Sequence, residues 1–424
     1  MKTKTNPLAL FDDLEHIATS KPASVIGKRK IQDYEQAIVF LKAYKGSLGT
    51  FNAYRREIEK LFQWAWNIKN KTIKDLKRED IESFVHFCQK PPAAWIGLKK
   101  SPRFIWKDGL RVPNFEWKPF VATVSKVAYR KGEKPDVKNF KLSISSTKDI
   151  FAVLSTFFNY LLQEEYVLTN PVALIRQKSK FIRKHQGLPK IRRLSELQWE
   201  YVIKTAKKMA EVDPKLHERT LFIMTALYAM YLRISELASS KRWTPMMNHF
   251  HRDSDGNWWF TTVGKGNKQR QIAVSDPMLN ALKRWRKHLN LSPLPSPADV
   301  NFLLLKTKGT GPISSTTYIR DIVQNCFNRA IEKLNKGGFT EEADSLGEAT
   351  VHWLRHTGIS DDVKRRPREH VRDDAGHGSS AITDKYIDIH CKPGYMQKRQ
   401  WVFKCHLTGS NANKEYPQIH LISH

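Results

Sequence analysis

Six side chains in the second half of the chain have types and spacings that suit attack on a phosphodiester. A histidine and an arginine lie in HWLRHTG, a second histidine lies in AGHGSS, and a tyrosine follows nine residues later in TDKYID. An arginine in LRISEL and a lysine in GKGNKQR add two more cations. The six residues are His352, Arg355, His377, Tyr386, Arg233 and Lys265. They make a cationic set around one oxygen nucleophile.

A tyrosine that attacks a phosphodiester must lose its proton, and the charge that develops on the phosphate and on the leaving oxygen must be neutralised. Its ordinary pKa is about 10, so it needs a base or strongly positive surroundings at neutral pH. Arginines can fork onto phosphate oxygens and stay charged, a lysine can protonate the leaving oxygen, and a histidine can act as base. None of these roles requires a metal ion, and no cofactor is expected.

Each residue also has a plain structural interpretation. Arg233 and Glu236 are three residues apart and could form a structural ion pair. Lys265, between two glycines, could be a solvated lysine in a turn. A lone histidine is more often structural, so His352 gains its weight from the arginine three residues on, which shares its helix face. His356 is expected to face elsewhere.

The composition favours a polyanionic partner. The 424 residues include 72 basic and 42 acidic side chains, which gives a formal charge of +30 and a pI near 9.9. Nucleic acid is the commonest partner for such an excess. A membrane surface is the alternative, but no apolar run reaches the roughly 20 residues of a spanning helix. The amino end carries acids where a signal peptide would be apolar, so we expect a cytoplasmic, nucleoid-associated protein.

The cysteines indicate a reducing compartment. The chain has four, without the spacing of a disulfide framework, and they are Cys88, Cys326, Cys391 and Cys405. We expect reduced thiols. The pairs His390-Cys391 and Cys405-His406 could bind zinc, but their spacing fits no common zinc finger.

Apolar periodicity and breaks in it divide the chain into two domains, each preceded or followed by a more polar segment. The predicted parts are a flexible leader (1–24), a helical DNA-binding domain (25–175) with an insertion (91–138), a basic linker (176–193), a catalytic domain (194–390) and a tail (391–424). The linker contains no acidic residue and has Gly187 and Pro189. It is either a solvated charge run or a contact along a DNA backbone, in which case each phosphate contact adds about −0.9 to the log–log salt slope.

The first domain is expected to be helical. Apolar residues recur at helical spacing over 33–44, from Thr50 to Ala65, over Arg78–Cys88, and again from Thr147 until Asn170-Pro171 ends the pattern. The insertion fits neither helix nor regular strand. It interleaves basic residues with Trp95, Trp106 and Trp117, so it either touches a sugar-phosphate backbone or packs back on its own domain.

The second domain is expected to be mainly α with a small antiparallel sheet. Ser195 could cap its first helix, and a second, nearly all-apolar helix from about Leu216 runs into LRISEL. A hairpin follows, with strands over 258–263 and 270–274 and Lys265 at its tip. Ser314 or Ser315 could cap a long helix that ends at Gly337-Gly338, and Thr350 could cap the helix of HWLRHTG.

These motifs resemble those of a known family, the tyrosine recombinases or phage integrases. LRISEL is similar to the family's first arginine box, GKGNKQR to its lysine hairpin, HWLRHTG to its His-x-x-Arg box, and the run from GH to Tyr386 to its final segment. The likeness covers about residues 190–390, and all six positions occur in the family's order. It departs at Tyr231, where the family often has glycine, and at Pro393-Gly394, which would break a helix after the tyrosine.

The resemblance implies a site-specific recombinase or integrase that breaks and rejoins DNA strands through a 3′-phosphotyrosyl link. Tyr386 would attack the scissile phosphate, and Arg233 and Arg355 would clamp it. The resemblance also implies a helical, SAM-like core-binding domain ahead of an α+β catalytic domain, with double-stranded DNA held between them. Four copies of the chain would form a homotetramer that exchanges strands through a Holliday junction.

The remaining implied roles belong to Lys265, which would protonate the leaving oxygen, to His352, which would help deprotonate the tyrosine, and to His377, which would hydrogen-bond the phosphate.

Two other functions would use some of the same residues. A type IB topoisomerase would relax supercoils as a monomer, and a catalytically idle regulator would only bind DNA. The separate helical domain and the spacing from His377 to the tyrosine favour the recombinase.

Overall fold

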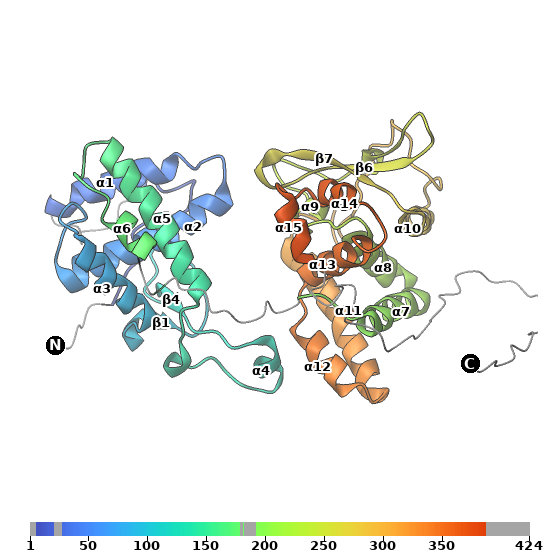
Figure 1. Cartoon of the computed structure of the whole chain (residues 1–424), viewed down its shortest axis with the longest axis horizontal. Helices are drawn as coiled ribbons and strands as arrows, with labels where there is room; N and C mark the ends of the chain where they lie inside the picture. Colours follow the sequence, from blue (N-terminus) through green and yellow to red (C-terminus); the bar gives the residue numbers. More distant parts are fainter. Residues whose placement is uncertain (1–5, 21–27, 179–180, 182–191, 387–424) are drawn as a thin grey trace, which may run out of the picture. The chain divides into compact units, whose positions relative to one another are not determined.

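The structure, a computed structural model, describes residues 6–20, 28–178, 181 and 192–386 of the 424-residue chain. The chain divides into two compact units, Met1–Lys190 and Ile191–His424. Figure 1 shows that the first unit is largely helical and that the second joins helices to a sheet. Among the described residues, no helix is long and apolar enough to cross a bilayer.

Amphipathic helices form the framework of the first unit. Their bounds are Lys28–Lys42 (α1), Leu48–Trp64 (α2), Arg78–Gln89 (α3), Ile144–Gln163 (α5) and Pro171–Lys178 (α6), and a π-helical turn over Ala65–Lys69 (η1) extends α2. Their apolar stripes meet in one core, so the predicted helices are confirmed. Two starts differ from the prediction. Helix α2 begins after Ser47 and so already contains Thr50, and Ser143 caps α5, which places Thr147 inside the helix.

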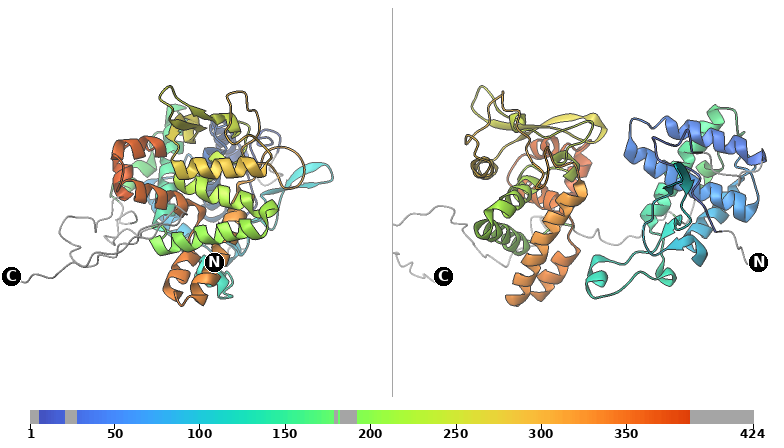
Figure 2. Two further views of the ribbon diagram at one scale, coloured as in Figure 1. Left: turned by 90° about the vertical axis from the view of Figure 1, so that its right-hand side faces the viewer. Right: turned by 180° about the vertical axis from the view of Figure 1, so that it is seen from behind.

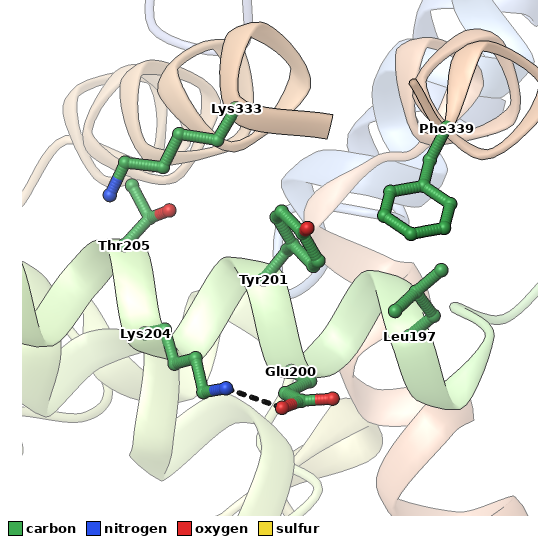
Figure 3. A pocket seen from close by; sticks show the side chains of 7 residues that line it. All are labelled: Leu197, Glu200, Tyr201, Lys204, Thr205, Lys333 and Phe339. Carbon is green, nitrogen blue, oxygen red and sulfur yellow. Dashed lines mark hydrogen bonds and ion pairs between the residues drawn. The ribbon is translucent and has the colours of Figure 1, made fainter. Parts of the chain in front are cut away.

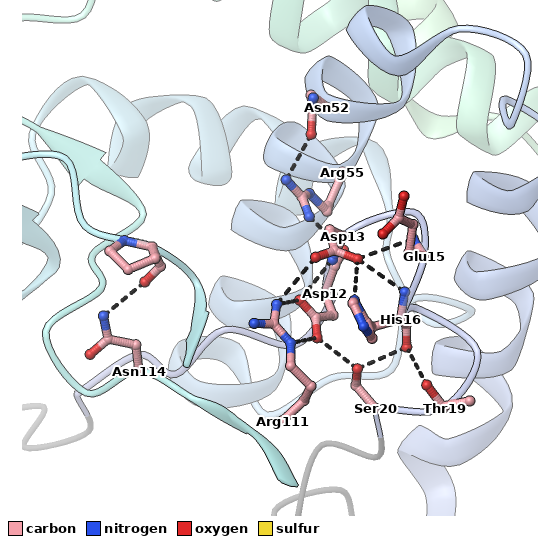
Figure 4. A network of polar contacts seen from close by, with 11 residues as sticks. Asp12, Asp13, Glu15, His16, Thr19, Ser20, Asn52, Arg55, Arg111 and Asn114 are labelled. Atoms are coloured by element: carbon pink, nitrogen blue, oxygen red, sulfur yellow. Dashed lines mark hydrogen bonds and ion pairs between the residues drawn. The ribbon is translucent and has the colours of Figure 1, made fainter. Parts of the chain in front are cut away.

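The leader is not loose where the structure describes it. Leu10, Phe11 and Ile17 are buried in the core of the first unit. Figure 4 shows how Asp12 and its neighbour Asp13 bind the guanidinium of Arg111, with Nε–Oδ2 of Asp12 at 2.9 Å. The expectation of a flexible leader is therefore wrong for residues 6–20, because two acids that looked like a polar start are ion-pair partners.

The insertion contains short strands that the sequence did not predict. Ile96–Gly97 (β1) pairs in parallel with Phe120–Val121 (β4), and Phe104–Lys107 (β2) pairs with Leu110–Pro113 (β3) as a hairpin. The packing alternative holds for two of its three tryptophans, and contact with a sugar-phosphate backbone stays a prediction. Trp95 and Trp117 are buried, whereas Trp106 on the hairpin is 63% exposed. An outlying segment follows, with Lys126–Arg130 (α4) and Val137–Asn139 (η3).

Helices also dominate the second unit. The longer ones are Glu196–Val212 (α7), Pro214–Ala229 (α8), Asp276–His288 (α10), Thr316–Lys336 (α11), Thr340–Glu348 (α12), Val351–Asp362 (α13) and Arg368–Ala375 (α14). Ser195 caps α7 in a capping box with Gln198, and Ser315 caps α11, both as predicted. Helix α8 contacts α7, α10 and α13 and is the centre of the core (Figure 2). The sequence did not predict α12.

A three-stranded antiparallel sheet completes the second unit. Phe250–Arg252 (β5), Trp258–Val263 (β6) and Gln269–Ala273 (β7) lie in chain order, and the turn over Lys265–Asn267 (η6) joins the last two. The predicted hairpin is confirmed, while β5 was not foreseen. The fold class, mainly α with a small antiparallel sheet, is confirmed.

The predictions for the cysteines, the tail and the linker concern residues of which the structure describes only some. Cys88 and Cys326 are buried free thiols. The tail over 391–424, with Cys391, Cys405 and the possible zinc ligands, lies outside the described residues, as does most of the basic linker.

Candidate active site

Arg233 sits in a break between two helices. Helix α8 ends at Ala229 instead of continuing into LRISEL as expected, and the short helix α9 covers Ile234–Leu237. Tyr231 lies in the break with φ 49°, a left-handed conformation that favours glycine. That conformation explains why glycine suits this position. Arg233 follows as the N-cap of α9, with 29% of its side chain exposed.

Glu236 holds Arg233 in place. Its carboxylate accepts the backbone N–H of Arg233 at 2.8 Å and the guanidinium at 3.0 Å, and it is 1% exposed. The structural ion pair foreseen for these two residues therefore exists. It leaves part of the arginine open to a second anion, because one carboxylate oxygen takes one of the five N–H donors.

Arg355 comes from α13, which packs closely against α8. A side chain at Gly358 would collide with the Tyr228 carbonyl, so a glycine is needed for this approach. Arg355 is 2% exposed and donates from Nη1 to the Tyr231 carbonyl and from Nη2 to the Ala375 carbonyl. Burial and the nearby Arg233 lower its pKa to about 10. Among the described residues, it has no carboxylate within ion-pair distance.

Tyr386 ends a short 3₁₀ turn, Asp384–Tyr386 (η7), after α15 (Ser380–Thr383), and lies between two histidine rings. Its ring stacks on His377 with centroids 5.6 Å apart and on His356 with centroids 5.0 Å apart. Burial raises the pKa of Tyr386, while the charges of Arg355 and Arg233 oppose that rise. The tyrosine is therefore a phenol at neutral pH that has two guanidinium groups nearby to stabilise its anion.

The histidines of the site are uncharged at neutral pH. Burial, followed by the charges of Arg355 and Arg233, lowers the pKa of His377 to about 4. Its Nδ1 lies 2.9 Å from the Thr383 hydroxyl, and Gly376 before it has φ 62°. Partial burial, followed by the charges of Arg355 and Arg233, also lowers the pKa of His352, which lies one helical turn before His356.

His356 is a member of the site that the sequence interpretation set aside. Its ring contacts both His352, at 4.4 Å between centroids, and Tyr386. Burial, then the charge of His352, lowers its pKa to about 4. The prediction that it faces elsewhere is wrong. The spacing of four residues from His352 was the available signal, because such residues share a helix face.

Lys265 begins the turn between β6 and β7, at the predicted hairpin tip. The turn has Gly266 at φ 77° and Asn267 at φ 59°. The side chain of Lys265 lies outside the part of the chain that the structure describes.

Arg270 is a second residue that the sequence interpretation missed. It lies on β7 with 10% of its side chain exposed, and both of its terminal nitrogens bind Glu236, at 2.8 and 2.7 Å. Its Nε donates to the Asp374 carbonyl at the end of α14, at 2.9 Å. Burial alone would raise the pKa of Glu236, but hydrogen bonds from Arg270 and the charge of Arg233 hold it below its ordinary value.

A surface cavity of ≈ 450 Å³ lies elsewhere in the second unit. Figure 3 shows side chains of α7, among them Tyr201, opposite Lys333 of α11 and Phe339. None of its lining residues belongs to the set around Tyr386. The candidate active site around Tyr386 is therefore identified by its arginines and stacked histidine rings, and not by a cavity.

A tyrosine beside two arginines and neutral histidines, on a helical unit with a small antiparallel sheet, defines the class of proteins that cleave phosphodiesters through a tyrosyl ester. Comparisons with known proteins agree with this class. The model of the Phage integrase family matches residues 192–392. Tyrosine recombinase XerC of Bacillus pumilus is 30% identical over 261 residues, which cover 60% of this chain and 74% of the relative. The chain belongs to this family, the tyrosine recombinases.

Further relatives agree in sequence and fold. Tyrosine recombinase XerC of Chlorobaculum parvum is 22% identical over 245 residues, covering 56% of this chain and 67% of the relative. Among solved structures, the XerH site-specific recombinase bound to palindromic difH substrate in a post-cleavage complex matches with a TM-score of 0.53 and 16% identity. That match covers 88% of this chain and 89% of XerH, and it supports the fold.

Proposed function

We propose that this recombinase cleaves double-stranded DNA by attack of Tyr386 on the scissile phosphate. Breaking and rejoining of DNA strands in site-specific recombination is the activity of its family. In the proposed step the tyrosine oxygen bonds to phosphorus, the bond from phosphorus to the 5′ oxygen breaks, and that oxygen leaves with a proton as a hydroxyl. The 5′ hydroxyl of another strand reverses the step, so no external energy is consumed.

The observation that carries this proposal is the surplus of positive charge next to the tyrosine. Arg233, Arg270 and Arg355 gather around one buried carboxylate, that of Glu236, which pairs with the first two. Arg355 is satisfied by backbone carbonyls alone in the described chain. A buried cation without an anion is costly, and a phosphate supplies the missing charge. The charge on that phosphate increases in the transition state, where such donors contribute most.

The other groups take roles that fit their surroundings. His352 serves as base for the tyrosine, because a neutral imidazole can accept a proton. His377 is neutral and donates or accepts one hydrogen bond with Thr383, which leaves its other nitrogen for a phosphate oxygen. Lys265, at the tip of the hairpin, protonates the leaving oxygen.

The proposed partner is duplex DNA, held by the catalytic unit and by the helical first unit acting as core-binding domain. Four copies of the chain assemble on paired sites and exchange strands through a Holliday junction. The charge of +30 supports the DNA partner, and the XerH relative was solved with its difH substrate. Action on such DNA predicts that the protein is found with the nucleoid.

A suicide duplex tests the proposed function. Random duplexes bound by the Tyr386→Phe variant would first supply a target site, since this variant keeps the cations but has no nucleophile. A nick placed just beyond the scissile phosphate then lets a short fragment diffuse away after cleavage. We expect wild type to form a covalent protein–DNA adduct, seen on a denaturing gel, and Tyr386→Phe to form none.

The outcomes separate the proposed function from its rivals. An equal absence of adduct for wild type and Tyr386→Phe on the selected site would leave a DNA-binding regulator. Relaxation of any supercoiled plasmid by monomers would indicate a topoisomerase. Joining of two marked duplexes that both contain the selected site would support recombination by a tetramer.

A further inference from the structure

The geometry points to Arg270 as a positioning residue that fixes three separate motifs of the active site to one another. It lies on β7, five residues or more from each of the six proposed catalytic residues in sequence. Its proposed role is distinct from theirs, because all three nitrogens of its guanidinium bind protein groups, two of them a carboxylate, which neutralises its charge. The inference rests on the proposed roles of the residues that it positions.

The contacts of Arg270 reach three chain segments. Its forked pair of bonds to Glu236 fixes the carboxylate that in turn holds Arg233. Its Nε bond to the Asp374 carbonyl ties down the end of α14, two residues before Gly376 and three before His377. Its own strand carries the hairpin with Lys265. One planar guanidinium therefore joins the arginine motif, the hairpin and the histidine loop.

The neighbouring glycines show how closely these segments approach the guanidinium. A Cβ at Gly264 would lie 2.9 Å from Arg270 Nη1 and 3.1 Å from Glu236 Oε1. A Cβ at Gly376 would lie 2.8 Å from Arg270 Cδ, and this glycine also has a positive φ. Glycines of the hairpin and of the histidine loop thus cover the arginine from two sides. A lysine could replace the charge but not the fork of bonds.

Arg270 also acts on the histidine loop through its charge. After burial, the charges of Arg355, Arg233, Arg270 and His352 lower the pKa of His377. The groups that face His377 come from every neighbouring element: Arg233 before α9, Arg270 on β7, His352, Arg355 and His356 on α13, Thr383 on α15, and Tyr386. Removing one of these charges therefore changes the protonation of the loop as well as its position.

A matched pair of substitutions tests the positioning role. Arg286 is the control, because it is also a buried arginine of the second unit whose Nε binds a carbonyl, that of Ser292, and whose Nη1 binds a carboxylate, that of Asp299. We expect Arg270→Lys to slow single-turnover cleavage of the suicide duplex by about 100-fold, the size typical of a misplaced catalytic group. Its affinity for DNA should stay within about threefold, since phosphate contacts elsewhere dominate binding. Arg286→Lys should cleave at the wild-type rate under conditions in which both variants are folded.

The pH profile distinguishes positioning from general loss of structure. We expect Arg270→Gln, which removes the charge, to move the acid limb of the cleavage profile to higher pH, because His377 then gains a proton more easily. Arg270→Lys should leave that limb in place and lower the plateau. Arg286→Gln should change neither.

Hydrogen exchange supplies a readout that does not depend on catalysis. Arg270→Lys should speed amide exchange both in the hairpin 264–268 and in the loop 376–379, with no change in α10. Gly264→Ala, which presses on the same ion pair, should give the same pattern. Wild-type cleavage and slow exchange in Arg270→Lys would overturn the inference while leaving the proposed function intact. No adduct from wild type would instead refute the proposed function, and the exchange result would still decide whether Arg270 joins the loops.

Discussion

Each unit contains a buried cluster of charged side chains, and the two clusters differ in their balance. In the first unit three acids interact with three arginines, so the charges are matched: Glu59 pairs with Arg103, and Asp12 and Asp13 pair with Arg111 and also interact with the charge of Arg55. Around Tyr386 lie three arginines and one carboxylate, that of Glu236, which pairs with Arg233 and Arg270 but not with Arg355. A matched cluster is complete by itself, whereas a surplus of buried cations is completed by a ligand.

The difference also appears in what each cluster joins. The first-unit cluster ties the amino-terminal segment to the β2–β3 hairpin and so closes a structure. The cluster of the second unit ends in a half-buried tyrosine. Charge balance therefore distinguishes the structural network from the proposed active site, and it can be altered in either unit by single substitutions.

The largest effect, a loss of cleavage rate, is expected from Arg355→Ala in the cluster around Tyr386. Loss of one preorganised cation should reduce the single-turnover cleavage rate by about 10²–10³-fold. DNA affinity should change little, because other basic contacts supply most of it. Parallel gel shifts and suicide-duplex assays measure both quantities. A gel shift weakened as much as cleavage would contradict the view that this arginine serves the transition state.

The matching substitution in the balanced cluster is Arg111→Ala, which leaves Asp12 buried at 2% exposure without its partner. Breaking a buried ion pair costs roughly 3–5 kcal/mol, and the 17% exposure of the Arg111 side chain sets the expectation at the lower end. Calorimetry should show a lower melting temperature for the first unit and an unchanged one for the second. Cleavage at 20 °C should remain at the wild-type rate, and a slowed chemical step would remove the distinction between the clusters.

Acid should also affect the two units differently. His356 and His377 have folded pKa values of about 4 against an ordinary 6.5, so the unfolded chain binds more protons between these values. Their contribution to stability is complete above pH 6.5 and is lost as the pH falls toward 4. Asp13 of the first unit has a lowered pKa, so its contribution is lost only below 3.8. Unfolding followed at pH 7 and pH 5 should therefore show a loss in the second unit, reduced in His356→Gln.

The sequence predicted the elements of the catalytic unit because its signals are local. The apolar alternation of the hairpin, the cap at Ser195 and the spacing of His352 and Arg355 depend on neighbours within a few residues. The pairing of Arg233 with Glu236 was foreseen for the same reason.

The interpretation failed where partners are distant in the chain. Arg270 binds Glu236 across 34 positions, and Arg111 binds Asp12 across 99, so neither residue differs locally from a solvated charge. His356 was missed because its chain neighbour, Arg355, was taken to define the active face. In fact the ring of His356 meets Tyr386 from a later segment. Such contacts depend on tertiary packing, which periodicity does not encode.

The smallest effect, a change in the salt dependence of DNA binding, is expected from the surface of the first unit. There a surplus of positive charge is exposed instead of buried. Residues 126–141 carry six basic and two acidic side chains, and Lys131 and Lys134 are exposed there. Should this segment follow a DNA backbone, replacing both lysines by glutamine would flatten the log–log salt dependence of binding by about 0.9 per contact, or about 2 together. Cleavage at saturating protein would not change.

A charge change of opposite sign in the same segment is the control. Glu133→Gln with Asp136→Asn makes the segment more positive, so affinity at a fixed salt concentration should rise where the lysine variant falls. Identical salt slopes for wild type and the two variants would show that the segment carries a solvated charge run. Opposite shifts would show that the surplus in the first unit binds DNA through screened contacts, whereas the buried surplus around Tyr386 acts on the reacting phosphate. The two surpluses would then differ in the salt dependence of their effects, because burial shields charges from ions.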